Sequence, residues 1–209
     1  RVGLAGVFQV DGPFRTATAG SGDRPPRAML ADDPEPGGHA GGVSILGGAM
    51  KPTPLFQRDY HALREPFRAF ADLALEPRMK AAADALWDAF HSAGVSWVGF
   101  YLAGDDHESM VLGPRRDKPA CSPIGLHGAC GQSFRSGKPL VVHDVAQLGE
   151  GYIACDPRDR SEVVLPLFDD KPKPEGHAGA PGCWGVLDVD SHEVGAFTQD
   201  DAAELAALM

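Results

Sequence analysis

VSWVGFYLA, residues 95–103, is an apolar run rich in β-branched and aromatic residues, and it predicts a buried strand. Side chains alternate between the two faces of a strand, so two aromatics and a glycine share one face: Trp97, Gly99 and Tyr101. On strand rise alone, the glycine leaves a notch about 13 Å long between the two rings. The polar turn 104–108 then predicts a return strand over Ser109–Leu112.

Outside this hairpin the chain predicts helices first and strands afterwards. We expect helices over 57–75, restarting at Pro66, and over Pro77–Ala93, where Gly94 ends the helix. Further strands are expected at Leu140–Val142, Glu162–Phe168 and Cys183–Asp190. A short helix is expected from Gly128–Cys130 to before Gly137, and a last helix after Thr198, with Asp201 completing a capping box. Short loops and few crossovers favour an α+β fold with a mostly antiparallel central sheet flanked by helices.

Composition divides the chain into two parts. Residues 1–50 hold 11 Gly and 5 Pro without a period, which predicts a disordered Gly/Pro-rich extension over 1–52. Residues 53–209 are long enough for one domain with its own core. Asp169–Gly182, rich in Pro, Gly and Lys, is expected to be an exposed hairpin loop.

Charge and hydropathy exclude several classes of protein. The net charge of −10 argues against nucleic-acid binding and against an anionic membrane surface. No apolar run approaches the ~18 residues of a membrane span, and no secretory signal is present in this sequence. Four cysteines are too few for a disulfide scaffold, so we expect a soluble, cytoplasmic protein.

Three cysteines lie in small-residue contexts within 35 residues: Cys121, Cys130 and Cys155. Loops and element ends leave a thiol reachable, whereas Cys183 lies in an apolar run beside Trp184 and is expected to be structural. Cys130 would begin a helix, whose dipole favours the thiolate. One such cysteine alone is more often inert, but three together favour a thiol–disulfide redox centre.

A zinc site is the main chemical alternative. A Cys₃His set is available in Cys121, His127, Cys130 and Cys155. The close Cys-x₂₋₄-Cys pairing of most zinc sites is missing, so the redox hypothesis is favoured.

Acidic residues alternate with core residues on two predicted strands. Asp188 and Asp190 share one face of the last strand, and Glu162 begins another strand that can converge on the same face. A solvated sheet face would explain them as well. If they are buried, such acids must bind a cation or share protons.

Several motifs in order resemble those of the free methionine-(R)-sulfoxide reductases, enzymes built on a GAF domain. The most specific are Trp97-Val-Gly-Phe-Tyr101, Gly128-Ala-Cys130-Gly131, Ile153-Ala-Cys155-Asp156, Arg160-Ser-Glu162 and Gly185-Val-Leu-Asp188-Val-Asp190-Ser191. The resemblance covers about residues 56–209 and implies a GAF-like catalytic domain that reduces free L-methionine-(R)-S-oxide.

The resemblance also implies roles for these residues. Cys155 would attack the sulfoxide and become a sulfenic acid, Cys121 would resolve it as a disulfide, and Cys130 would be a second resolving or relay thiol. Glu162, Asp188 and Asp190 would protonate the oxygen and bind the substrate ammonium; Trp97 and Tyr101 would contact its thioether end. No bound cofactor or metal is expected, and thioredoxin, reduced by NADPH and thioredoxin reductase, would be the reductant.

A non-catalytic GAF module that senses a small molecule is the rival interpretation. It predicts binding without turnover and no need for Cys155. A homodimer is one possibility, because the sequence does not determine the oligomeric state.

Overall fold

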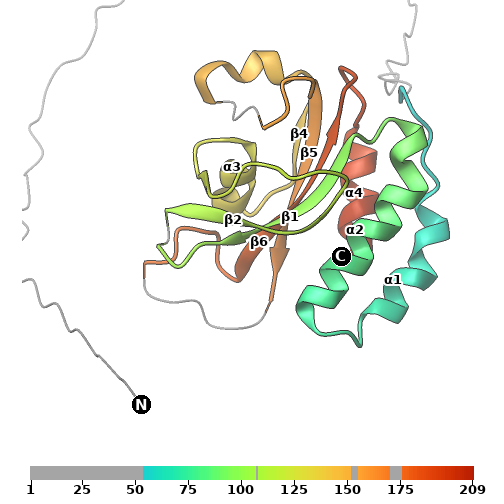
Figure 1. Ribbon diagram of the computed structural model, residues 1–209, viewed down its shortest axis with the longest axis horizontal. Coiled ribbons are helices and arrows are strands. Elements are labelled where there is room, and N and C mark those ends of the chain that lie inside the picture. Colours follow the sequence, from blue (N-terminus) through green and yellow to red (C-terminus); the bar gives the residue numbers. More distant parts are fainter. Residues whose placement is uncertain (1–53, 107, 152–154, 170–175) are drawn as a thin grey trace, which may run out of the picture. The chain divides into compact units, whose positions relative to one another are not determined.

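The computed structural model describes residues 54–106, 108–151, 155–169 and 176–209 (Figure 1). The chain divides after Gly48, and every element below belongs to the unit Ala49–Met209. The disordered extension predicted over 1–52 lies outside the described residues, as do residues 170–175 of the predicted loop Asp169–Gly182.

A six-stranded antiparallel sheet forms the centre of the domain. Its strands are β1 (Trp97–Ala103), β2 (Ser109–Arg116), β3 (Ile124–Gly125), β4 (Leu140–Val142), β5 (Ser161–Phe168) and β6 (Cys183–Ser191). Their order is β3-β2-β1-β6-β5-β4, and each neighbouring pair is antiparallel. The predicted mixed fold with an antiparallel sheet is confirmed.

Helices cover both faces of the sheet. The α-helices are α1 (Arg64–Phe70), α2 (Leu75–Phe90), α3 (Ala129–Ser136) and α4 (Gln199–Leu208). Short 3₁₀ segments are η1 (Tyr60–Leu63), η2 (His91–Ala93) and η3 (Val145–Gly151). Figure 1 shows α1, α2 and α4 together on one side of the sheet and α3 on the other.

The helix ends follow local signals in the sequence. Gly94 and Gly137 adopt positive φ values of 85° and 65°, the left-handed conformation in which glycine ends a helix without steric cost. Thr198 and Asp201 form the reciprocal capping box that starts α4. The predicted helix over 57–75 is shorter than expected, because ordered helix begins at Tyr60 and ends at Phe70.

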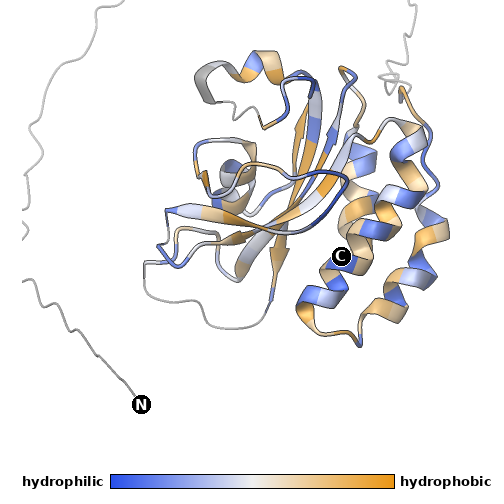
Figure 2. Ribbon diagram, in the orientation of Figure 1, coloured by the Kyte–Doolittle hydropathy of each residue, from blue (hydrophilic) through white to orange (hydrophobic). Residues whose placement is uncertain are grey.

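Two hydrophobic clusters lie on opposite faces of the sheet, and the strand alternation decides which residues enter each. One cluster joins α2 and α4 to Val98, Phe100, Leu187 and Val189. The other joins α3 to Trp97, Tyr101, Val164 and Val186. In Figure 2 the central strands are largely hydrophobic, as expected for strands covered on both faces.

A buried arginine ties the start of the domain to α4. The Arg58 side chain is 0% exposed and donates to Asp201 Oδ1 (3.1 Å), Ala196 O (3.0 Å) and Ala93 O (2.9 Å). Tyr60 Oη donates to the same Asp201 oxygen at 2.7 Å. These bonds satisfy a charge that would otherwise be costly to bury.

Three features differ from the sequence-based expectation. β2 runs to Arg116 rather than ending at Leu112, and β3 and η3 were not predicted. Pro114, Arg115 and Arg116 do not look like strand residues, but tertiary contacts hold them: Arg116 pairs with Asp84 of α2 at 3.0 Å. Among the described helices, none has the length and apolar character needed to cross a bilayer.

Candidate active site

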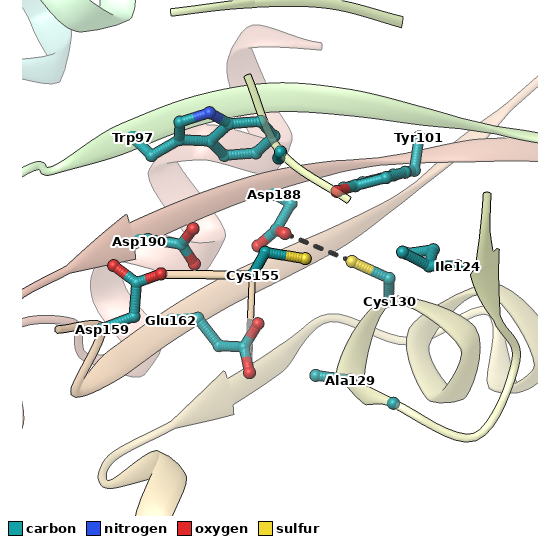
Figure 3. Close-up of a pocket in the computed structure, with 12 residues that line it drawn as sticks. Trp97, Tyr101, Ile124, Ala129, Cys130, Cys155, Asp159, Glu162, Asp188 and Asp190 are labelled. Carbon is teal, nitrogen blue, oxygen red and sulfur yellow. Dashed lines mark hydrogen bonds between the residues drawn. The ribbon is translucent and has the colours of Figure 1, made fainter. Parts of the chain in front are cut away.

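A small cavity of about 40 Å³ opens on the face of the sheet that carries α3 (Figure 3). Strands β1, β3, β5 and β6, the start of α3 and two loops line it. The residues are Trp97, Tyr101, Ala120, Ile124, Gly128, Ala129, Cys130, Cys155, Asp159, Glu162, Asp188 and Asp190. Seven of the eight site residues named from the sequence therefore line one cavity, and the eighth, Cys121, lies next to Ala120.

The two aromatics of β1 form the wall of the cavity, but the predicted notch between them is wrong. A Cβ on Gly99 would lie 2.1 Å from the Trp97 ring, so the indole folds over the glycine. The two ring centroids are 6.1 Å apart. Gly99 is therefore needed to seat the indole, and the space that strand rise alone would leave open is filled.

Both aromatics also hold the loop that carries Cys121. Trp97 Nε1 donates to the carbonyl oxygen of Lys118 at 2.9 Å, and Tyr101 Oη donates to that of Cys121 at 3.0 Å. Buried Trp and Tyr usually find a partner for their polar atom, and here that partner is the backbone of one loop. The strand thus fixes the position of Cys121.

The three predicted acids meet in the cavity, as the sequence anticipated. Cα pairing sets Glu162 of β5 opposite Asp190 of β6, and Gly99 of β1 opposite Asp188. One carboxylate oxygen from each acid lies within 4.8 Å of the others. Glu162 Oε1 and Asp188 Oδ1 are buried and have no hydrogen-bond partner within the described residues. A solvated sheet face is excluded, because Glu162 and Asp188 are each only 6% exposed.

Burial and mutual repulsion favour the protonated form of these acids. Burial is the main cause for each, and it raises the pKa of Asp188 to about 7 although the Cys130 thiol donates to it. The pKa values of Glu162 and Asp190 are raised well above their usual range by burial and then by Asp188. At neutral pH the cluster therefore holds protons that it can donate.

The sequence reasoning missed a fourth acid, Asp159. Asp159 is 7% exposed, lines the cavity and accepts a hydrogen bond from Ser96 Oγ at 3.3 Å. Its pKa is raised, first by burial and then by Asp156. Asp159 precedes β5 in a charged loop, where an acid normally faces water, so no local signal marked it.

Cys155 and Cys121 lie together at the mouth of the cavity. Both residues are exposed and neither is in a disulfide. Burial of its sulfur against the cavity wall, followed by a side-chain hydrogen bond with Cys121, raises the pKa of Cys155 to about 12. Cys155 is therefore a thiol at neutral pH, with the second thiol in contact.

Cys130 differs from the expectation in two respects. It lies in the first turn of α3, but it is buried in the wall of the cavity and only 6% exposed. Its Sγ donates to Asp188 Oδ2 at 3.3 Å, and burial followed by the charge of Asp188 raises its pKa well above the usual range. The prediction that the helix dipole would favour its thiolate is wrong, because desolvation and the acids outweigh the dipole. Cys183 is buried, as predicted.

The zinc hypothesis does not fit the geometry. Over the described ranges, the residues grouped closely enough to hold a metal ion are Asp156, Asp159 and His192, and the triad Glu162, Asp188 and Asp190. The proposed Cys₃His set does not come together there, since His127 lines a different, more open surface pocket.

The fold and the site define a class of protein. The GAF domain profile matches residues 78–209, and the chain therefore belongs to the GAF domain family. The predicted resemblance to one branch of that family is confirmed by two curated relatives. The chain is 38% identical over 117 residues to the free methionine-R-sulfoxide reductase of Escherichia coli K12. It is 30% identical over 131 residues to the free methionine-R-sulfoxide reductase of Saccharomyces cerevisiae.

These alignments cover 55% and 61% of this chain, and 62% and 67% of the relatives. The chain thus spans about two thirds or less of the curated relatives it matches. A solved structure extends the similarity: the free methionine-R-sulfoxide reductase of Neisseria meningitidis, in complex with its substrate. It is 32% identical with a TM-score of 0.61, covering 75% of this chain and 90% of that one.

Proposed function

We propose that this protein reduces free methionine-(R)-sulfoxide to methionine through Cys155. The observation that carries the proposal is the contact of Cys155 with a second thiol, Cys121, beside a buried cluster of protonated acids. A sulfoxide reductase needs these groups: a nucleophilic sulfur, a resolving thiol and a proton donor. Similarity to three reductases of that name supports the same activity.

The acid cluster suits a free amino acid better than a residue in a protein. The substrate ammonium would bind among Glu162, Asp188 and Asp190, where two buried oxygens have no hydrogen-bond partner in the described part of the chain. A peptide-bound methionine sulfoxide lacks that charge and would leave these acids without a cationic partner. Trp97 and Tyr101 would contact the methyl and thioether end of the substrate.

In the first step the Cys155 sulfur attacks the sulfoxide sulfur, and the oxygen moves to Cys155. A carboxyl of the cluster donates its proton to that oxygen, because an unprotonated oxide is a poor leaving group. The thiol proton of Cys155 passes to the carboxylate so formed. Methionine is released, Cys155 becomes a sulfenic acid, and the cluster regains its proton.

In the second step the Cys121 thiol attacks the sulfenic sulfur. An S–S bond forms, the S–O bond breaks and water leaves with the Cys121 proton. Thioredoxin, reduced by NADPH through thioredoxin reductase, would return both cysteines to thiols by exchange. None of the four cysteines is in a disulfide, which suits work in a reducing compartment such as the cytoplasm.

The test is NADPH consumption with free methionine-(R)-sulfoxide, thioredoxin and thioredoxin reductase. We expect turnover in the intact protein and none in Cys155→Ser. Cys183→Ala is the matched control, because Cys183 is buried outside the cavity and its loss should leave turnover in place. N-acetyl-methionine-(R)-sulfoxide, which lacks the ammonium, should be a poor substrate. Turnover that survives in Cys155→Ser would refute the mechanism.

The sensor hypothesis predicts the opposite pattern. Free methionine or its sulfoxide would bind in a calorimeter, NADPH would not be consumed, and Cys155→Ser would bind as tightly as the parent. The contact between Cys155 and Cys121 favours the reductase, since a binding module has no use for paired thiols.

A further inference from the structure

The two paired thiols lie on loops rather than on strands or helices. Cys121 lies between β2 and β3, and Cys155 lies between η3 and β5. A disulfide requires the two sulfurs at about 2 Å and the Cα atoms within about 7 Å. Loops are more mobile than strands. The rate at which the disulfide forms therefore depends on the contacts that hold the two loops close together.

The loop of Cys121 is held by the sheet. Trp97 and Tyr101 of β1 donate to the carbonyl oxygens of Lys118 and Cys121, one at each end of the segment. These two bonds fix the backbone of the segment and do not involve the Lys118 side chain. The ammonium of Lys118 points to the loop that carries Cys155.

The loop of Cys155 is organised by the next residue, Asp156. Asp156 Oδ1 accepts from the backbone N–H of Arg158 at 3.0 Å, and the Asp156 carbonyl accepts from the N–H of Asp159 at 3.1 Å. Asp156 Oδ2 lies 2.7 Å from Lys118 Nζ, and this ion pair joins the two loops. The Asp156 side chain is 11% exposed and that of Lys118 is 30% exposed, so water screens the pair only in part.

Resting on the proposed function, we infer that the Lys118–Asp156 ion pair positions Cys155 against Cys121 for the disulfide-forming step. Lys118 and Asp156 are positioning residues, since they act through the cysteines that they flank. In the step they serve, the Cys121 sulfur bonds to the sulfenic sulfur of Cys155, and the hydroxyl leaves as water. The first step does not depend on the pair, because Cys155 then attacks the substrate and not Cys121.

Arg158 supplies a matched control. It also pairs with Asp156 Oδ2, at 2.8 Å, but it belongs to the same loop as Cys155 and its side chain is 65% exposed. Removing it takes a positive charge from the same carboxylate without cutting the link between the loops. Lys118→Met and Arg158→Met therefore lose equal charge beside the same carboxylate, but only Lys118→Met removes a contact between the two loops.

The experiment is a single turnover of reduced protein with one equivalent of free methionine-(R)-sulfoxide. Released methionine reports the first step. Mass spectrometry after quenching with dimedone, which traps sulfenic acid, reports the second step. In Lys118→Met we expect disulfide closure about fivefold slower, with trapped Cys155 sulfenic acid accumulating. Methionine release should stay within about twofold of the parent, since the first step does not use the contact between Cys155 and Cys121.

Rescue separates positioning from a general structural role. Lys118→Arg keeps the ion pair, so its disulfide should form at the parent rate. The disulfide of Arg158→Met should also form at the parent rate, because the link between the two loops is kept. The inference is overturned if Lys118→Met closes as fast as the parent, if Arg158→Met is equally slow, or if methionine release falls by the same factor.

A second measurement is independent of the sulfoxide reaction. The reduced protein is equilibrated with mixtures of oxidised and reduced glutathione, and the fraction with a Cys121–Cys155 disulfide is counted. Lys118→Met should need about fivefold more oxidised glutathione for half formation, and Lys118→Arg should match the parent. If the parent releases no methionine, the proposed function fails, yet this titration still decides whether the ion pair positions the thiols.

Discussion

Replacing Asp188 by asparagine removes an ionisable group from the buried face of β6 while keeping its shape. Asparagine can still accept the Cys130 S–H, and its amide can donate to the neighbouring carboxylates, which lie within 4.8 Å. The change therefore isolates the charge of Asp188. We expect Asp188→Asn to make the protein more stable at alkaline pH and to abolish the reductase activity proposed above.

The magnitude follows from the pKa of Asp188, which is raised from 3.8 to about 7 mainly by burial. Each pKa unit corresponds to about 1.4 kcal/mol, so ionising Asp188 in the fold costs about 4 kcal/mol more than in the unfolded chain. The sign follows from proton binding: between pH 3.8 and 7 the folded state binds more protons, so the free energy of unfolding falls as pH rises. Above pH 7 the full cost is present, and asparagine removes it.

Urea denaturation of parent and variant at pH 4 and pH 8 measures this effect. At pH 8 the variant should unfold at higher urea, by about 2–4 kcal/mol at an unchanged slope, and at pH 4 the difference should nearly vanish. Asp106→Asn is the control: hydrogen bonds from Ser109 and Glu108 lower the pKa of this exposed carboxyl, so its loss should not stabilise the protein at pH 8. The reasoning would be refuted if the variant were less stable than the parent at pH 8. It would also be refuted if the free energy of unfolding changed by the same amount at pH 4 and pH 8.

Three further predictions concern other parts of the domain. Arg58→Met should cost about 3–5 kcal/mol of unfolding free energy in urea, because it leaves Asp201 buried without its cation. Gly131→Ala should lower stability by about 1–3 kcal/mol in thermal denaturation, since its Cβ would lie 2.2 Å from the backbone oxygen of Leu126. Alkylation of Cys155 by iodoacetamide, mapped by mass spectrometry, should keep rising from pH 7 to pH 10 without a plateau, because its pKa is about 12.

The faces of the central strands could be read from the sequence because the signal is local. Side chains alternate with a period of two, so the shared face of Asp188 and Asp190 and the opposite face of Leu187 and Val189 follow from their order alone. The helix ends at Gly94 and the capping box at Thr198 are local in the same sense. These features need no knowledge of what packs against them.

The state of each cysteine depended on distant parts of the chain. In the sequence, Cys130 and Cys155 both lie in small-residue contexts, which predict a thiol that can be reached. In the structure the sheet buries Cys130 against Asp188, 58 positions away, and leaves Cys155 at the mouth of the cavity. Because desolvation depends on everything that surrounds a group, the pKa of a thiol does not follow from its neighbours in sequence.

The sequence by itself determined the antiparallel α+β fold, the shared face of Asp188 and Asp190, and the burial of Cys183. Tertiary structure decided which thiols meet, that Asp159 joins the acids, and that the Trp97 indole fills the space over Gly99. The physical reason is one of range: periodicity and caps act within a few residues, whereas burial, pairing and proton affinity depend on contacts that only the folded chain makes.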